Sequence, residues 1–220
     1  MSATLPNQEV RPALGPELAR TAWLHERMLP EGFFARLGAR FLRRYHEAFA
    51  ASPEAEVLVA HDGAAPSGML VGTYDNAAHY RWVLHRRAPL LALAGLGALL
   101  CRPRRAVEFL RTRVGRYARA VRRFVGRRRR RPAVTADDSA VRVAVLTHVA
   151  VAPEAQGAGA GRRLVRTFVE RARRHGADEA RLITPAEGPG PRFYRSLGWR
   201  RLRSRRASDG TVVDEFVLPL

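Results

Sequence analysis

The chain has 220 residues and a mass of 24.5 kDa, which suits one domain with a core of ordinary size and excludes several domains. Its 46% hydrophobic and 27% charged residues are typical of a globular protein and argue against wholesale disorder. A single cysteine, Cys101, excludes an intrachain disulfide and a four-cysteine zinc site.

The formal net charge of +19 is concentrated in one part of the sequence. All 39 basic residues are arginine, and 17 of them lie between Arg81 and Arg131 with one acid, Glu108. The rest of the chain therefore carries only +3. We expect a nearly neutral domain that contains one very basic segment.

The first part of the chain predicts a short strand, two helices and a hairpin. Residues 10–13 read as the strand, and apolar residues at steps of three and four predict helices on either side of the break at 30–32. The second of these helices carries a stripe formed by Phe34, Leu37, Phe41 and Tyr45. Residues 57–60 and 68–74 predict an antiparallel hairpin.

Residues 76–140 depart from this regular pattern. The apolar run 88–101 is too short to span a bilayer upright. Apolar residues then recur at steps of three and four over 107–124 with arginines between them, which predicts a basic amphipathic helix that the run 127–131 closes.

The last part of the chain is regular again. A strand at 141–151 leads through the glycine-rich turn 156–161 into a helix that ends at Gly176. A strand at 180–184 and a short helix at 191–197 follow, so the order predicts a βαβ unit with a right-handed crossover. The final predicted elements are two hairpin strands, 200–206 and 211–218.

The turn from Gln156 to Gly161 suits an anionic ligand. Small residues let a ligand approach the backbone, and free N–H groups at a helix N-terminus favour a phosphate or pyrophosphate. A purely structural connection would look similar. The late position of the strand argues against a dinucleotide fold, and the missing Gly-Lys-Ser/Thr excludes a Walker loop.

Two motifs in this region resemble one known family. Residues 149–165, with Gln156, Gly159 and Gly161 at the fixed positions, closely resemble the central motif of the GNAT N-acetyltransferase superfamily. Residues 192–199, with Phe193, Tyr194 and Gly198, resemble its second signature at the right spacing. The resemblance covers 141–220 closely and 8–75 loosely.

The resemblance implies an α/β fold, namely a GNAT-like mixed, mostly antiparallel sheet flanked by helices. The segment 76–140 departs from the family pattern, because it exceeds the usual connection between the third and fourth strands, and we expect it to form a basic helical insert there. We therefore expect a single domain over 1–220, with the insert at 76–140.

The resemblance also implies a reaction, in which an acetyl or other small acyl group moves from acetyl-CoA to an amine by direct attack in a ternary complex. The Val149 N–H is expected to polarise the thioester carbonyl. Tyr194 is expected to protonate the departing thiolate, because a phenol has a pKa close to that of a thiol. The expected cofactor-binding residues are Val149, Val151, Gln156, Gly157, Ala158, Gly159, Ala160, Gly161 and Arg162.

A base must take a proton from the amine. His148 is the first candidate, Glu187 the second and Asp75 the third, and a water chain with no dedicated base is a further alternative. Glu187 and Gly190 stand where many family members have Asn and Ala. The histidines show no metal-ligand spacing with acids, so no metal is expected.

The basic segment leaves three interpretations open. It can attract an anionic substrate or the phosphates of CoA, bind an anionic membrane surface, or bind nucleic acid. The alternative to an enzyme is a CoA-binding or adaptor protein that acts through this segment on membrane or nucleic acid. We expect a cytoplasmic monomer or homodimer, and peripheral attachment to the inner face of the membrane is the alternative.

Overall fold

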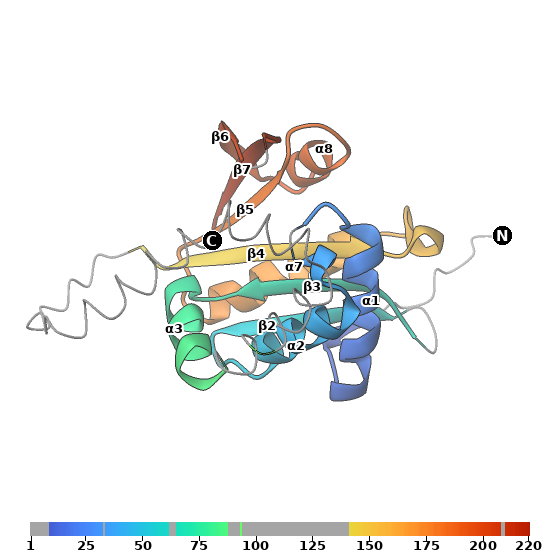
Figure 1. The fold of residues 1–220 in the computed structure, drawn as a ribbon. Coiled ribbons are helices and arrows are strands. Elements are labelled where there is room, and N and C mark those ends of the chain that lie inside the picture. The colour runs from blue at the N-terminus through green and yellow to red at the C-terminus, as the bar shows by residue number, and fades with distance from the viewer. Residues whose placement is uncertain (1–8, 33, 62–64, 88–92, 94–140, 208–209) are drawn as a thin grey trace, which may run out of the picture.

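A computed structural model describes residues 9–32, 34–61, 65–87, 93, 141–207 and 210–220. Their strands form one seven-stranded sheet in the order β1-β2-β3-β4-β5-β7-β6 (Figure 1). All neighbouring strands are antiparallel except β4 and β5, which are parallel. The predicted mixed α/β fold is confirmed, whereas most of the expected insert lies outside the described residues.

The N-terminal part contains one strand and two helices: β1 (Val10–Pro12), the 3-10 turn η1 (Gly15–Glu17), α1 (Leu18–Met28), the 3-10 turn η2 (Ala35–Leu37) and α2 (Ala39–Ala50). The prediction of one helical stripe from Phe34 to Tyr45 is wrong at Gly38. This residue has a φ of +92°, a conformation that glycine adopts without a steric penalty, so the chain turns there before α2 begins.

The hairpin follows as β2 (Ala55–His61) and β3 (Pro66–Thr73), and nearly all of its residues are buried. Helix α3 (Asn76–Arg86) comes next. Its first turn is capped by the Asp75 carboxylate, which accepts the Ala78 N–H at 2.9 Å. The helix predicted over 107–124 lies outside the described residues.

The C-terminal part follows the predicted order: β4 (Val143–Val151), the 3-10 turn η3 (Pro153–Ala155), α7 (Ala160–Arg174), β5 (Glu179–Pro185), α8 (Gly190–Arg195), β6 (Arg200–Arg206) and β7 (Val212–Pro219). The parallel pair β4 and β5, joined through α7, is the predicted βαβ unit. Every residue of the edge strand β6 is exposed, and five of its seven residues are arginine.

Helix α7 lies on one face of the sheet and α1 and α2 on the other (Figure 1), and an apolar cluster fills each side. On one face Leu164 and Phe168 of α7 pack against the strands, and on the other face Phe41 and Phe49 of α2 do so. The approach of α7 is close, since a Cβ on Gly72 of β3 would lie 2.4 Å from the Phe168 ring. A glycine at this position lets the helix reach the sheet.

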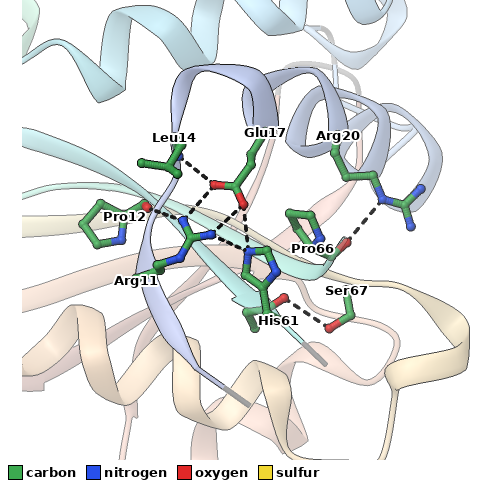
Figure 2. Close-up of polar contacts among 9 residues, drawn as sticks. Arg11, Pro12, Leu14, Glu17, Arg20, His61, Pro66 and Ser67 are labelled. Atoms are coloured by element: carbon green, nitrogen blue, oxygen red, sulfur yellow. Dashed lines mark hydrogen bonds and ion pairs between the residues drawn. The ribbon is translucent and has the colours of Figure 1, made fainter. Parts of the chain in front are cut away.

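A polar cluster fastens the start of α1 to the sheet (Figure 2). The Arg11 guanidinium donates to both carboxylate oxygens of Glu17 at 2.8 and 2.9 Å, and His61 Nε2 lies 2.8 Å from Glu17 Oε1. The hydrogen bond from Arg11 holds the pKa of Glu17 down at about 2. Nearby, Arg20 donates to the Pro66 carbonyl at 3.2 Å and so ties α1 to β3.

Glu56 of β2 is a carboxylate inside the core. Only 6% of the residue is exposed, and its Oε2 lies 3.5 Å from Arg171 Nη1 of α7. Burial raises the pKa of Glu56 from 4.5 to about 7. The folded protein therefore holds a proton here that the unfolded chain releases at lower pH.

Because Glu56 keeps this proton only in the folded protein, we expect the free energy of unfolding to fall as pH rises from about 4.5 to about 7, by up to about 3 kcal/mol. Glu56→Gln keeps the shape and removes the titration, so its free energy of unfolding should change less over this window. Urea unfolding at pH 5 and pH 8 measures both proteins. The exposed Glu31→Gln is the control and should follow the wild type. Equal pH dependence of wild type and Glu56→Gln would contradict the assignment.

Candidate functional site

The sheet splits between β4 and β5. Of the two strands, only Val143–Leu146 of β4 and Glu179–Leu182 of β5 pair with each other. Beyond this point β4 stays paired with β3, and β5 stays paired with β7. The β5-facing edge of β4 from Thr147 to Val151 therefore has no strand partner among the described residues, and its backbone groups are open to an extended ligand.

An irregularity in β4 coincides with the split. Val71 of β3 pairs with His148, but the next residue, Gly72, pairs with Leu146, so Thr147 is an extra residue in the ladder. Such a bulge bends the strand and increases its twist. Beyond it, His148 lies on the sheet face that α1 and α2 cover, while Val149 and Val151 pack on the α7 face.

The open edge of β4 leads directly into the glycine-rich turn. The Gln156 side chain donates to the Val151 carbonyl at 3.1 Å, and the Arg163 guanidinium donates to the Ala158 carbonyl at 2.9 Å. Gly157 and Gly159 have φ values of +82° and +83°, which side-chain-bearing residues rarely adopt. These features fix the backbone of the turn at the start of α7.

The fixed turn presents a row of backbone donors. Among the described residues, none of the N–H groups from Gly157 to Arg162 has a hydrogen-bond acceptor. The positive end of the α7 dipole lies at the same place, and Arg162 is exposed beside it. This arrangement suits a phosphate or pyrophosphate.

Tyr194 lies on α8, on the α7 side of the sheet. Its ring packs against Trp199 and Phe216, with centroids 6.0 and 6.2 Å away, and only 8% of the residue is exposed. Burial raises the pKa of Tyr194 to about 12. The phenol is therefore protonated at neutral pH and can serve as a proton donor.

His148 lies on the other face of the split. It is half-buried, with its Nε2 3.5 Å from the Tyr45 hydroxyl and its ring centroid 4.2 Å from that of His25. Burial, followed by the neighbouring His25 and His46, lowers the pKa of His148 well below its usual value. A neutral imidazole at neutral pH has a free lone pair and can accept a proton.

The other two base candidates lie on other parts of the chain than β4. Glu187 is exposed in the loop between β5 and α8. The Asp75 carboxylate caps α3, and Thr73 of β3 pairs with Val145, so Asp75 follows the strand end remote from Val151. The sequence did not single out Tyr45 or His25 as neighbours of His148. The apolar stripe gave Tyr45 only a core role, and no local spacing links His25 to β4.

The departure from the family pattern at Gly190 has a steric reason. Gly190 begins α8, and a Cβ on it would lie 2.3 Å from the Oγ1 of Thr184 in β5. The threonine at the end of β5 therefore requires a glycine at this position of α8. The contact also sets how closely the helix that carries Tyr194 approaches the sheet.

Comparison with known proteins finds a family match over part of the chain. Residues 121–201 match the family model described as an acetyltransferase (GNAT) domain. No curated protein matches the chain closely enough to count as a relative.

Solved structures share the fold. A protein from Desulfovibrio desulfuricans, described as an acetyltransferase of the GNAT family, is 16% identical with a TM-score of 0.53, over 96% of this chain and 98% of that one. The ribosomal-protein-S18-alanine N-acetyltransferase from Escherichia coli is 12% identical with a TM-score of 0.54, over 96% and 93%. A chain of the NatC complex bound to Gag peptide and CoA is 14% identical with a TM-score of 0.54, over 97% and 98%.

Residues 121–201 therefore match a GNAT acetyltransferase domain, and the chain shares the fold of a solved acetyltransferase of that family. This domain match supports an acyl-CoA-dependent acetyltransferase whose donor is acetyl-CoA. In the parts of the chain that the structure describes, no helix has the length and apolar character needed to cross a membrane. The same residues contain no group of three or more side chains suited to hold a metal ion.

The contact between Gly190 and Thr184 can be tested by a double substitution. Gly190→Ala alone should lower stability by about 1–3 kcal/mol, because the added methyl group overlaps the threonine hydroxyl. Adding Thr184→Ala removes that hydroxyl and should recover part of the loss. Thermal unfolding of the four proteins of this cycle gives the coupling energy. Strictly additive effects would show that the two residues do not meet.

Proposed function

We propose that the protein transfers an acetyl or other small acyl group from acetyl-CoA to an amine by direct attack within a ternary complex. The observation that carries the proposal is the open edge of β4, which leads without a break into the N–H groups at the start of α7. An extended arm that ends in a pyrophosphate matches these two features in order. CoA has this construction.

The donor is held mainly by backbone groups. The pantetheine amides pair with Val149 and Val151 as an added strand would, and the pyrophosphate accepts hydrogen bonds from the N–H groups of Gly157 to Arg162. The Val149 N–H faces the thioester carbonyl and stabilises the negative charge that develops on its oxygen. Gln156 supports both parts, because its side chain ties the turn to the end of β4.

Proton transfers complete the reaction. The amine nitrogen attacks the thioester carbon, a C–N bond forms and the C–S bond breaks. His148 receives the proton that the amine loses, and Tyr194 gives its proton to the thiolate of CoA. Exchange with water then restores both side chains. Glu187 in the exposed loop is the second candidate for the base.

A single domain over residues 1–220 agrees with the sheet topology. Strand β3 ends at Thr73 and β4 begins at Val143, yet the two strands are neighbours in the sheet. The segment 76–140 thus leaves and re-enters the sheet at adjacent strands, as an insert does.

The activity is tested with the purified protein, acetyl-CoA and a panel of acceptors: a small amine, an amino sugar and a peptide with a free N-terminus. Direct attack predicts intersecting initial-velocity lines when both substrates are varied. It also predicts that Cys101→Ala keeps the rate, because no acyl-cysteine forms and the chain has no other cysteine. Parallel lines would indicate a covalent intermediate, and no turnover with any acceptor would refute the transfer reaction.

The pyrophosphate position predicts a charge effect at Gly159. Gly159→Asp and Gly159→Asn have nearly the same shape, and both residue types tolerate positive φ better than others do. Only the aspartate places a negative charge beside the phosphates, so it should bind acetyl-CoA at least about tenfold more weakly than the asparagine variant, or about 1.4 kcal/mol. Calorimetry measures both affinities. Equal affinities would show that the pyrophosphate does not bind at this turn.

The acid role predicts that Tyr194→Phe lowers kcat by about a hundredfold or more, since the variant lacks the proton donor. The affinity for acetyl-CoA should stay within a few-fold of wild type because the ring still fills its place between Trp199 and Phe216. A leaving group with a lower thiol pKa should reduce the defect. An unchanged kcat would show that the phenol is only a packing residue.

A further inference from the structure

Behind His148 lies a buried group of polar side chains that the proposed reaction does not use. His25 of α1 is 1% exposed, and His46 of α2 and Thr21 of α1 are fully buried. Buried polar groups are costly unless they are hydrogen-bonded, and these three are bonded to one another.

The hydrogen bond of the Thr21 hydroxyl sets the direction of the others. The hydroxyl donates to the Leu18 carbonyl at 3.1 Å, so its one proton is used there. Thr21 Oγ1 is also 2.8 Å from His46 Nδ1 and must accept from it, which assigns the proton of His46 to Nδ1. Burial lowers the pKa of His46 to about 3, so the ring is neutral at neutral pH.

The next bond follows from this assignment. A neutral His46 with its proton on Nδ1 has a lone pair on Nε2, which lies 3.0 Å from His25 Nδ1. His25 must therefore donate from Nδ1. Since burial also lowers the pKa of His25, to about 4, the ring is neutral and its Nε2 carries a lone pair instead of a proton.

This chain ends at the candidate base. The His25 ring lies 4.2 Å from the His148 ring between centroids. Its one N–H is directed at His46, so it presents no N–H to His148. The other tautomer of His25 would direct an N–H dipole at His148 and oppose a positive charge there, so this tautomer makes protonation of His148 easier than the other one would.

We propose that Thr21, His46 and His25 are positioning residues for acyl transfer. They form a one-way hydrogen-bond chain that locks the tautomer of His25 and so favours transfer of the amine proton to His148. The inference rests on the proposed role of His148. The only covalent change is one N–H bond broken at the amine and one formed at His148, and no proton needs to move along the chain.

The tautomers of the wild-type protein give the first test and need no variant. In ¹⁵N-histidine NMR at pH 7, His25 and His46 should both be neutral with the proton on Nδ1 and an unprotonated Nε2. An Nε2–H on His25, or an imidazolium at either residue, would overturn the inference. This measurement does not depend on activity.

Thr21→Val gives the second test, because it removes the hydroxyl and keeps the shape. His46 Nδ1 then has no acceptor, and the tautomers of His46 and His25 should redistribute. We expect kcat to fall about tenfold, part of the 10²–10⁴-fold that a general base contributes, with KM for both substrates unchanged. Thr21→Ser should restore both kcat and the tautomers.

A matched control lies elsewhere in the protein. Ser52 Oγ is 3.0 Å from His79 Nδ1, another buried hydroxyl–imidazole pair, and the His79 ring packs against Phe49 and Tyr80. Ser52→Ala should leave kcat unchanged even where it lowers stability. A folded Thr21→Val with altered tautomers and wild-type kcat would overturn the inference.

The titration of His148 separates this inference from the proposed function. The titratable groups that face it among the described residues are His25 of α1 and His46 and Tyr45 of α2, while β3 places Val71 opposite it. Thr21→Val should lower the midpoint of His148. If no amine is acetylated, the proposed function fails, but an altered midpoint still supports the coupling. An unaltered midpoint contradicts the coupling, whatever the activity.

Discussion

The pairing of β4 with β5 ends at Leu146 and Leu182, and the arrangement of the candidate site depends on this limit. Each strand keeps a second partner, β3 for β4 and β7 for β5, so both remain ordered where they part. The backbone groups freed in the middle of the sheet need hydrogen-bond partners, from water or from a ligand. A binding edge is thus produced by the sheet itself and requires few special side chains.

The same limit places the two candidate proton carriers on different elements and different faces. Tyr194 packs into the apolar cluster on the α7 side, and His148 faces α1 and α2. Burial disfavours the charged form of both groups. It therefore keeps the phenol protonated and the imidazole unprotonated, which are the states that an acid and a base need before the reaction.

The sequence predicted those features that depend on local patterns. Apolar periodicity and the glycine-rich turn gave β4, α7 and β5, because helix caps and strand composition act over a few residues. The break at Gly38 was missed because a stripe of apolar residues continues across it. The extra residue Thr147 could not be recognised in a strand rich in valine, since a shift of the strand pairing by one residue leaves the composition of the strand unchanged. His25 and His46 meet His148 only through tertiary packing of α1 and α2 on the sheet, which no spacing in the chain reveals.

The arginines of β6 have a consequence for how the molecule behaves among its own copies. Two carboxylates of β7, Asp214 and Glu215, lie 3.6 and 2.7 Å from Arg201 and Arg203, so the strand is only partly neutralised. An edge strand can accept another strand along its open side, and a second copy approaching there would bring two rows of five arginines together. The opposite edge, β1, is only three residues long. Like-charge repulsion at one end and a short strand at the other therefore prevent the sheet from growing sideways into an aggregate.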